Sequence, residues 1–174
     1  MIKTERLEIR EIDNETAYLI EHNSENNEDK TYDFSSFMHE IVQDNGFGVD
    51  EILEIIQVLA KVIKRDSNNS MIFGAYDSEN NLIACARFYN SQSNTPEISI
   101  TVDKPYRQNG YATEFLTSLL QYMFKIRNDE YYIYRIIKCN KASEKLINKL
   151  GGVLQKPETK AEGLIFGDYD LFRQ

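Results

Sequence analysis

One segment of the chain, residues 96–124, has the pattern of a β-strand, a tight turn and an amphipathic helix in succession. Pro96 precedes an alternating run from Glu97 to Val102, which is typical of a strand. Apolar residues then recur at helical spacing to about Ile126. This succession constrains the fold more than any other feature, because it requires a strand and a helix to meet at a sharp corner.

The turn inside this segment carries Arg107, Gly110 and Ala112. These residues fit the motif [QR]-x-x-G-x-[GA], where x is any residue. A helix N-terminus has N–H groups without partners and the positive end of the helix dipole, so it suits a phosphate or pyrophosphate. Gly110 can adopt a positive φ or allow close approach to the backbone. The alternative is an ordinary strand–turn–helix connection that binds no ligand, in which glycine only makes the sharp turn possible.

The bulk composition favours one globular domain over residues 1–174. The net charge of −8 counts against nucleic-acid binding and suits a cationic substrate, although acidity can also serve solubility alone. No run approaches the roughly 18 apolar residues of a membrane span, and the N-terminus is charged from the start. We therefore expect a cytoplasmic protein with no membrane partner.

Cys85 and Cys139 are too few for a disulfide framework, and no Cys/His cluster has metal-ligand spacing. We expect no metal, and Cys139 is interpreted as a core residue because no histidine lies near it in the sequence.

The remaining pattern predicts the order β–α–α–β–β–β–α–β–α–β–β, an α+β chain with a mixed sheet and helices on both faces. The run from Tyr131 to Lys138 is expected to be buried on both faces. The other predicted strands are 4–12, 71–76, 82–88, 153–155 and 164–172, and the other helices begin near Asp13 and span 34–42, 50–65 and 141–150.

The turn at Arg107–Ala112 resembles the pyrophosphate turn of the GNAT superfamily of acyl-CoA-dependent N-acetyltransferases. Three further segments resemble the branch that contains the ribosomal-protein N-terminal acetyltransferases and related small-amine enzymes. They are Thr4–Arg10, Gly110–Glu114 running on to Tyr122–Phe124, and Asn140–Ser143 followed by Leu150–Gly152, although Gly152 replaces the usual aromatic residue. The resemblance implies a GNAT-like, mostly antiparallel sheet of about seven strands.

The resemblance also implies direct transfer of an acetyl group from acetyl-CoA to an amine, either a protein N-terminal α-amine or a small-molecule amine. In this family the pantetheine pairs with the strand at Ile100–Val102, and an N–H of this strand stabilises the oxyanion. Many relatives pair through their terminal strands, so a homodimer is a further expectation. The residues expected to bind acetyl-CoA are Ile100, Thr101, Val102, Arg107, Gln108, Asn109, Gly110, Tyr111, Ala112, Thr113 and Asn140.

Glu97 is the candidate general base. Strand alternation puts Glu97, Ser99 and Thr101 on one face, and a polar face on a central strand is costly unless it lines a wet cleft. The alternative is a carboxylate that only orients the substrate.

Asn140 is a good helix N-cap, and the resemblance adds a contact with the pantetheine. The same resemblance implies that Ser143 lies near the sulfur of CoA, where it is the candidate general acid for the leaving thiolate; the alternative is a purely structural residue.

A second function stays open: a non-catalytic GNAT-fold module that binds acyl-CoA as a regulator. It would keep the turn but tolerate loss of Glu97, whereas an enzyme would not.

Overall fold

The computed structural model describes residues 1–17, 69–89, 96–137, 140–155, 159–161 and 164–173. The predicted helices at 34–42 and 50–65, and Cys139, lie outside these residues. The helix expected to begin near Asp13 is confirmed: residues 14–17 are helical, and of the two possible caps, Asp13 and Asn14, it is Asp13 whose Oδ1 accepts the N–H of Thr16 at 2.7 Å.

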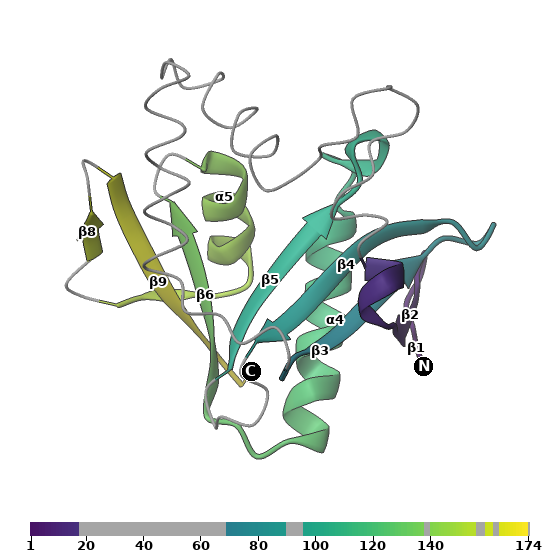
Figure 1. The fold of residues 1–174 in the computed structure, drawn as a ribbon, viewed down its shortest axis with the longest axis horizontal. Helices are drawn as coiled ribbons and strands as arrows, with labels where there is room; N and C mark the ends of the chain where they lie inside the picture. Colours follow the sequence, from purple (N-terminus) through teal and green to yellow (C-terminus); the bar gives the residue numbers. More distant parts are fainter. Residues whose placement is uncertain (18–68, 90–95, 138–139, 156–158, 162–163, 174) are drawn as a thin grey trace.

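The described residues form one mixed, mostly antiparallel sheet of nine strands with helices, so the predicted α+β class is confirmed (Figure 1). The order is β1-β2-β3-β4-β5-β6-β9-β7, with β8 paired to β9. The strands are β1 (Ile2–Lys3), β2 (Glu8–Glu11), β3 (Met71–Tyr76), β4 (Leu82–Tyr89), β5 (Glu97–Val102), β6 (Tyr131–Ile137), β7 (Val153–Leu154), β8 (Thr159–Ala161) and β9 (Leu164–Phe172).

Two helices follow the central strands. A 3-10 turn, η1 (Lys104–Tyr106), leads from β5 into α4 (Tyr111–Ile126), and α5 (Lys141–Lys149) follows β6. The apolar stripe of α4 packs on one face of the sheet, where Phe115, Leu119 and Met123 are fully buried. The succession of strand, turn and helix predicted from the sequence is therefore confirmed.

Three expectations about strands were wrong. The strand predicted at 4–12 covers only β2 (Glu8–Glu11), because the N–H of Thr4 bonds the carbonyl of Leu7 at 2.9 Å and residues 4–7 turn the chain; β1, which precedes this turn, was not predicted. The strand β8 was not predicted. Strand β6 alternates buried and half-buried residues from Tyr131 to Ile136, so it is deeply buried on one face only.

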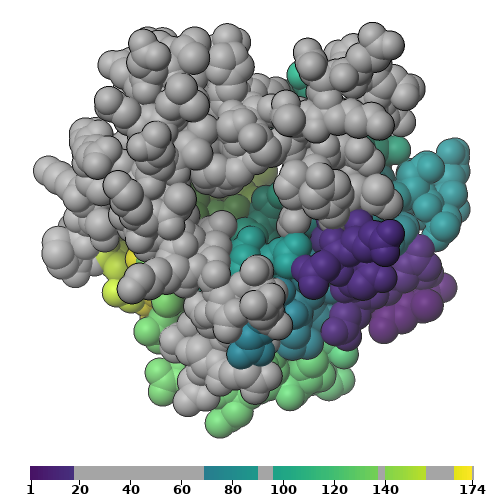
Figure 2. All heavy atoms as spheres, in the orientation of Figure 1, coloured from purple at the N-terminus to yellow at the C-terminus, as the bar shows by residue number. Residues whose placement is uncertain are grey.

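In the space-filling view, the N-terminal residues lie at the side of the molecule, against β3 (Figure 2).

The packing around Gly152 explains why a glycine replaces the aromatic residue that is usual in the branch that the sequence resembles. A Cβ there would lie 2.6 Å from Cγ1 of Ile147 and 3.1 Å from its carbonyl oxygen. Ile147 is fully buried, so this corner has no room for a side chain.

The strands β5 and β6 are parallel and part from one another. Their register contains a single pair, Glu97 with Ile133, although each strand continues beyond it. On its other edge β5 pairs with β4 over its whole length. Figure 1 shows the two strands diverging toward their C-terminal ends, where α4 and α5 begin.

The N-terminal segment is tied to the start of α4 by one carboxylate. Glu114 accepts hydrogen bonds from the Thr4 hydroxyl, from the Arg6 N–H at 3.0 Å and from Arg6 Nε at 2.7 Å. Burial by itself raises the pKa of Glu114, but these bonds together outweigh it and lower the pKa below its ordinary value. Glu114 therefore stabilises the fold in its ionised form.

We predict that Glu114→Gln lowers the free energy of unfolding at pH 7 by about 1–2 kcal/mol, because charge-assisted bonds to Thr4 and Arg6 are lost. The folded-state pKa is depressed, so this contribution is fully present above the ordinary value of 4.5 and is lost as the pH falls below it. Thermal or urea unfolding between pH 7 and pH 3 measures it, with the exposed Glu79→Gln as a control. A wild-type advantage that persists unchanged at pH 3 would contradict the assignment.

Candidate functional site

The turn before α4 has the backbone geometry of an anion site. Gly110 is the N-cap residue, has φ of 83° and makes no side-chain cap. The first bond within the helix runs from the N–H of Glu114 to the carbonyl of Gly110 at 3.1 Å. The N–H groups of the first three helical residues, Tyr111 to Thr113, therefore have no partner inside the helix. A residue with a Cβ is strained at this φ, which explains the glycine.

Arg6 lies beside this turn. Its Nη1 donates to the carbonyl of Asn109 at 3.0 Å, and its guanidinium carbon lies 4.3 Å from the centre of the Tyr111 ring. The bond to Glu114 is the largest cause that raises the pKa of Arg6, so the side chain stays cationic. The turn thus combines helix N–H groups with a fixed positive charge.

The side chain of Arg107 points back along the chain: its Nε donates to the carbonyl of Val102 at 3.0 Å. Asn109 donates its Nδ2 to the carbonyl of Arg107 at 3.0 Å. These two side chains hold the turn in shape, whereas Gln108 adopts a positive φ of 62° and is exposed.

The backbone of β5 faces its two neighbours alternately. The carbonyl of Pro96 accepts from Ile133 on β6, whereas the N–H of Asp103 bonds Ile83 next to β4. By alternation, the main-chain groups of Ile100 and Val102 point to the side where β5 and β6 part, and those of Thr101 point to β4. Three residues of β5, Ile100 to Val102, are predicted to bind the pantetheine through the main chain. Thr101 pairs with Cys85 of β4, and the carbonyl of Val102 accepts from Arg107, so Ile100 and the N–H of Val102 are the groups that point to the open side.

Asn140 and Ser143 lie at the start of α5. Asn140 Oδ1 accepts the N–H of Ser143 at 3.0 Å, so the predicted capping role is confirmed. The NH2 half of the Asn140 amide remains able to donate. The first residues of α4 and α5 are Tyr111 and Lys141. Each helix follows one of the two parallel strands, and this topology brings the two N-termini to the same edge of the sheet.

Glu97 lies where β5 and β6 part and is only 8% exposed. Arg135 of β6 approaches it, with Nη1 to Oε2 at 3.6 Å. Arg135 also makes a two-pronged contact with Asp168 of β9, at 2.6 and 2.9 Å. This contact is the main cause that raises the pKa of Arg135, so a permanent cation lies beside the candidate base.

Sequence reasoning did not single out Arg6, Arg135 or Asp168 as site residues. Arg6 belongs to the N-terminal segment that carried the resemblance, and that position was the available signal. Arg135 and Asp168 are 33 positions apart and lie on strands that look ordinary by themselves.

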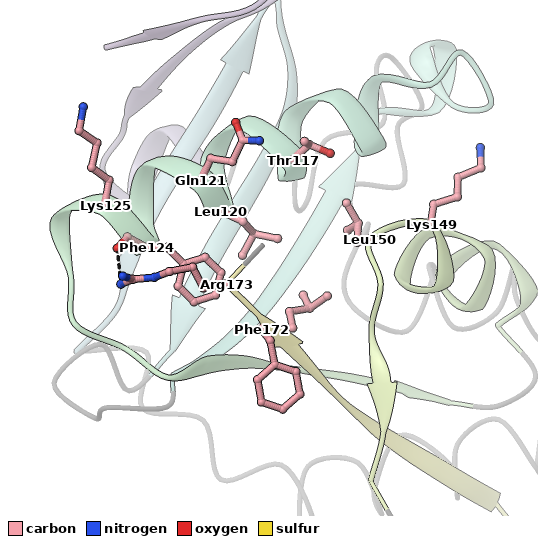
Figure 3. A pocket seen from close by; sticks show the side chains of 10 residues that line it. Thr117, Leu120, Gln121, Phe124, Lys125, Lys149, Leu150, Phe172 and Arg173 are labelled. Carbon is pink, nitrogen blue, oxygen red and sulfur yellow. Dashed lines mark hydrogen bonds between the residues drawn. The ribbon is translucent and has the colours of Figure 1, made fainter.

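A hollow of about 510 Å³ lies away from the turn, between the C-terminal half of α4, the end of α5 and β9 (Figure 3). Its wall is partly apolar, with Leu120, Phe124 and Leu150, and Arg173 caps α4 there by donating to the Phe124 carbonyl at 2.6 Å. None of the predicted site residues lines it.

The described residues contain no group of three or more His, Cys, Asp or Glu side chains that could hold a metal ion. Within the same residues, no helix is both long and apolar enough to cross a membrane.

Comparison with protein families gives a match over residues 6–153 to the model described as acetyltransferase (GNAT) domain. Comparison with curated proteins gives no match.

Several solved structures share the fold. Spermidine N-acetyltransferase from Vibrio cholerae, in complex with CoA and spermine, is 16% identical, with a TM-score of 0.63 over 97% of this chain and 96% of that one. The dodecameric form of that enzyme has a TM-score of 0.59, at 16% identity and 97% and 95% coverage. Ribosomal-protein-S5-alanine acetyltransferase from Vibrio fischeri has a TM-score of 0.58, also at 16% identity and 97% and 95% coverage. At this identity the likeness establishes the fold.

Proposed function

The chain belongs to the GNAT acetyltransferase family, and on that premise we propose that it is an acetyl-CoA-dependent N-acetyltransferase. The acetyl group passes directly to an amine in a ternary complex. The acceptor is a small-molecule amine or a protein N-terminal α-amine.

The observation that carries the proposal is the turn before α4. Gly110 at φ 83° leaves the first N–H groups of the helix without side-chain caps, and Arg6 adds a positive charge beside them. A pyrophosphate satisfies these donors and interacts favourably with the helix dipole. The CoA diphosphate is therefore the ligand that this geometry fits.

The pantetheine arm is assigned to the edge of β5 that turns away from β4. Main-chain groups of Ile100 and the N–H of Val102 point to this edge, and they can bond the amides of the arm as a further strand would. Asn140 can donate its NH2 group from the start of α5.

The reaction needs a neutral amine. At pH 7 an α-amine with a pKa of about 8 costs about 1.4 kcal/mol to deprotonate, whereas a lysine-like amine with a pKa of about 10.4 costs about 4.6 kcal/mol. Glu97 accepts this proton, directly or through a water, because it lies where the two strands part.

The amine nitrogen attacks the thioester carbon, and the carbon–sulfur bond then breaks to release the thiolate of CoA. An N–H of β5 stabilises the oxyanion, and one such donor is worth about 3 kcal/mol of barrier. The nitrogen loses its second proton after the attack, and the Ser143 hydroxyl relays a proton to the thiolate by giving one and taking up another. This relay helps the reaction only modestly, because a thiol with a pKa near 8.5 leaves tolerably as the anion.

The first test is calorimetric titration with acetyl-CoA, followed by a thiol-release assay across a panel of amines and peptides. We expect binding together with release of free CoA above background. Absence of binding would contradict the proposal altogether. Binding without thiol release from any acceptor would favour the non-catalytic regulatory module.

We predict that Gly110→Glu reduces acetyl-CoA affinity by at least about 100-fold, because the carboxylate repels the diphosphate and the new residue strains the turn. The matched control is Gly151→Glu, since Gly151 also has a positive φ, 73°, but lies at the end of α5. Both variants carry the same charge and a similar strain, so equal affinity in the two would remove the turn from the site.

We predict that Glu97→Gln lowers kcat by about 100-fold or more, while the affinity for acetyl-CoA stays within about twofold. The exposed Glu130→Gln, which removes the same charge just before β6, is the control. Steady-state kinetics between pH 6 and pH 9 test the role. A loss of less than about threefold, with an unchanged pH profile, would assign Glu97 to orientation alone.

A further inference from the structure

Three carboxylates lie on one face of the sheet, one on β5 and two on β9, with Arg135 of β6 between them. Glu97 is paired with Ile133, and Ile133 is paired with Asp170, so these three residues form one row across the sheet. Directly paired residues share a face, which places Asp170 on the same face as the candidate base. Arg135 and Asp168, the next pair on this face, are two residues further along.

The positive charge of this group, on Arg135, already interacts with two carboxylates. Arg135 holds Asp168 through two hydrogen bonds and lies 3.6 Å from Glu97. Asp170 has no ion pair within the part of the chain that the structure describes. It is the acidic member of the group that Arg135 does not neutralise.

Asp170 is also incompletely satisfied. It is only 5% exposed, and its Oδ2 accepts a hydrogen bond from Nε2 of Gln155. Its Oδ1 is buried and has no hydrogen-bond partner among the described residues. Leaving a buried carboxylate oxygen without a donor costs a substantial part of its hydration free energy, so such an atom needs an explanation.

The position of Asp170 gives that explanation. Two strand spacings separate it from Glu97, which corresponds to about 10 Å between the two backbones. Both side chains project from the same face, beside the point where β5 and β6 part. A donor about 10 Å from a reacting nitrogen at Glu97 matches this separation, and it would pair with the buried Oδ1 of Asp170 once the side chain or its cover moves.

We propose that Asp170 is a specificity-determining residue that binds a second positive charge of the acceptor. This inference rests on the proposed acetyltransferase function. The acceptor class is a primary amine that carries another ammonium or guanidinium group within about 10 Å of the reacting nitrogen. A short aliphatic diamine has this chemistry, and so does a peptide N-terminus followed by a basic side chain. In either case the second cation gives Asp170 the donor that it lacks, and the reaction itself is unchanged.

The test compares acceptors that differ only in the second charge. Cadaverine, an aliphatic diamine, is compared with pentylamine, and a tripeptide with lysine at its second position is compared with the same tripeptide containing norleucine. We expect the wild type to prefer the dicationic member of at least one pair by about tenfold or more in kcat/KM, as for a charge-assisted hydrogen bond. The pair that shows the preference identifies the source of the amine.

Asp170→Asn keeps the size of the side chain and its bond to Gln155 but removes the charge. We expect it to abolish the preference by raising KM for the dicationic acceptor, while kcat/KM for the monocationic acceptor stays within about twofold. Glu8→Gln, on the distant strand β2, removes the same charge from the chain and should leave the preference intact. A change common to both variants would indicate only general attraction by the acidic surface.

The outcomes separate this inference from the proposed function. A wild type that acetylates both members of each pair equally well overturns the role of Asp170 and leaves the acetyltransferase assignment in place. A wild type that acetylates none of the acceptors overturns both. These results come from the wild type alone, so they hold even if Asp170→Asn does not fold. An Asp170→Asn variant that retains the full preference also overturns the inference.

Discussion

The arrangement of the site depends on the separation of two parallel strands after a single paired residue. Strands β5 and β6 share the pair Glu97 and Ile133, and β5 then keeps its ladder only with β4. The main-chain groups of Ile100 and the N–H of Val102 thereby point away from β4, toward the side where β6 has parted from β5. Both following helices begin at the end where the strands part, and their unsatisfied N–H groups lie around the same region. One topological feature thus brings these main-chain groups and the starts of both helices to one region, where we propose that CoA binds.

The turn before α4 is held in place by the N-terminal segment. Glu114 collects hydrogen bonds from Thr4 and from the backbone and side chain of Arg6, and Arg6 reaches on to the carbonyl of Asn109. A turn with Gly110 as its N-cap has no cap of its own, so its shape depends on these neighbours. The N-terminal segment therefore acts as a brace for the site, which gives a physical role to residues that carried only a family resemblance.

Charge in the centre of the sheet is organised around Arg135. It joins Asp168 tightly and Glu97 more loosely, and it leaves Asp170 with an amide as its hydrogen-bond partner. A buried carboxylate without a cation beside it, such as that of Asp170, lowers the stability of the fold, and a cationic ligand can offset that free-energy cost. The proposed transfer of an acetyl group and the proposed selection of a dicationic acceptor use the two ends of the same row of side chains.

The sequence by itself determined the local elements: the strand, turn and helix around Gly110, the cap at Asn140, the strands β3 and β4, and the class of fold. These depend on residues a few positions apart, whose spacing sets hydrogen bonding and burial directly. Only the tertiary structure decided that β5 and β6 part, that a turn at residues 4–7 separates β1 from β2, and that Arg6 lies at the turn before α4. It also placed Arg135, Asp168 and Asp170 on the same face of the sheet as Glu97. Such contacts follow from the order and register of strands far apart in the chain, and no local pattern of residues specifies that register.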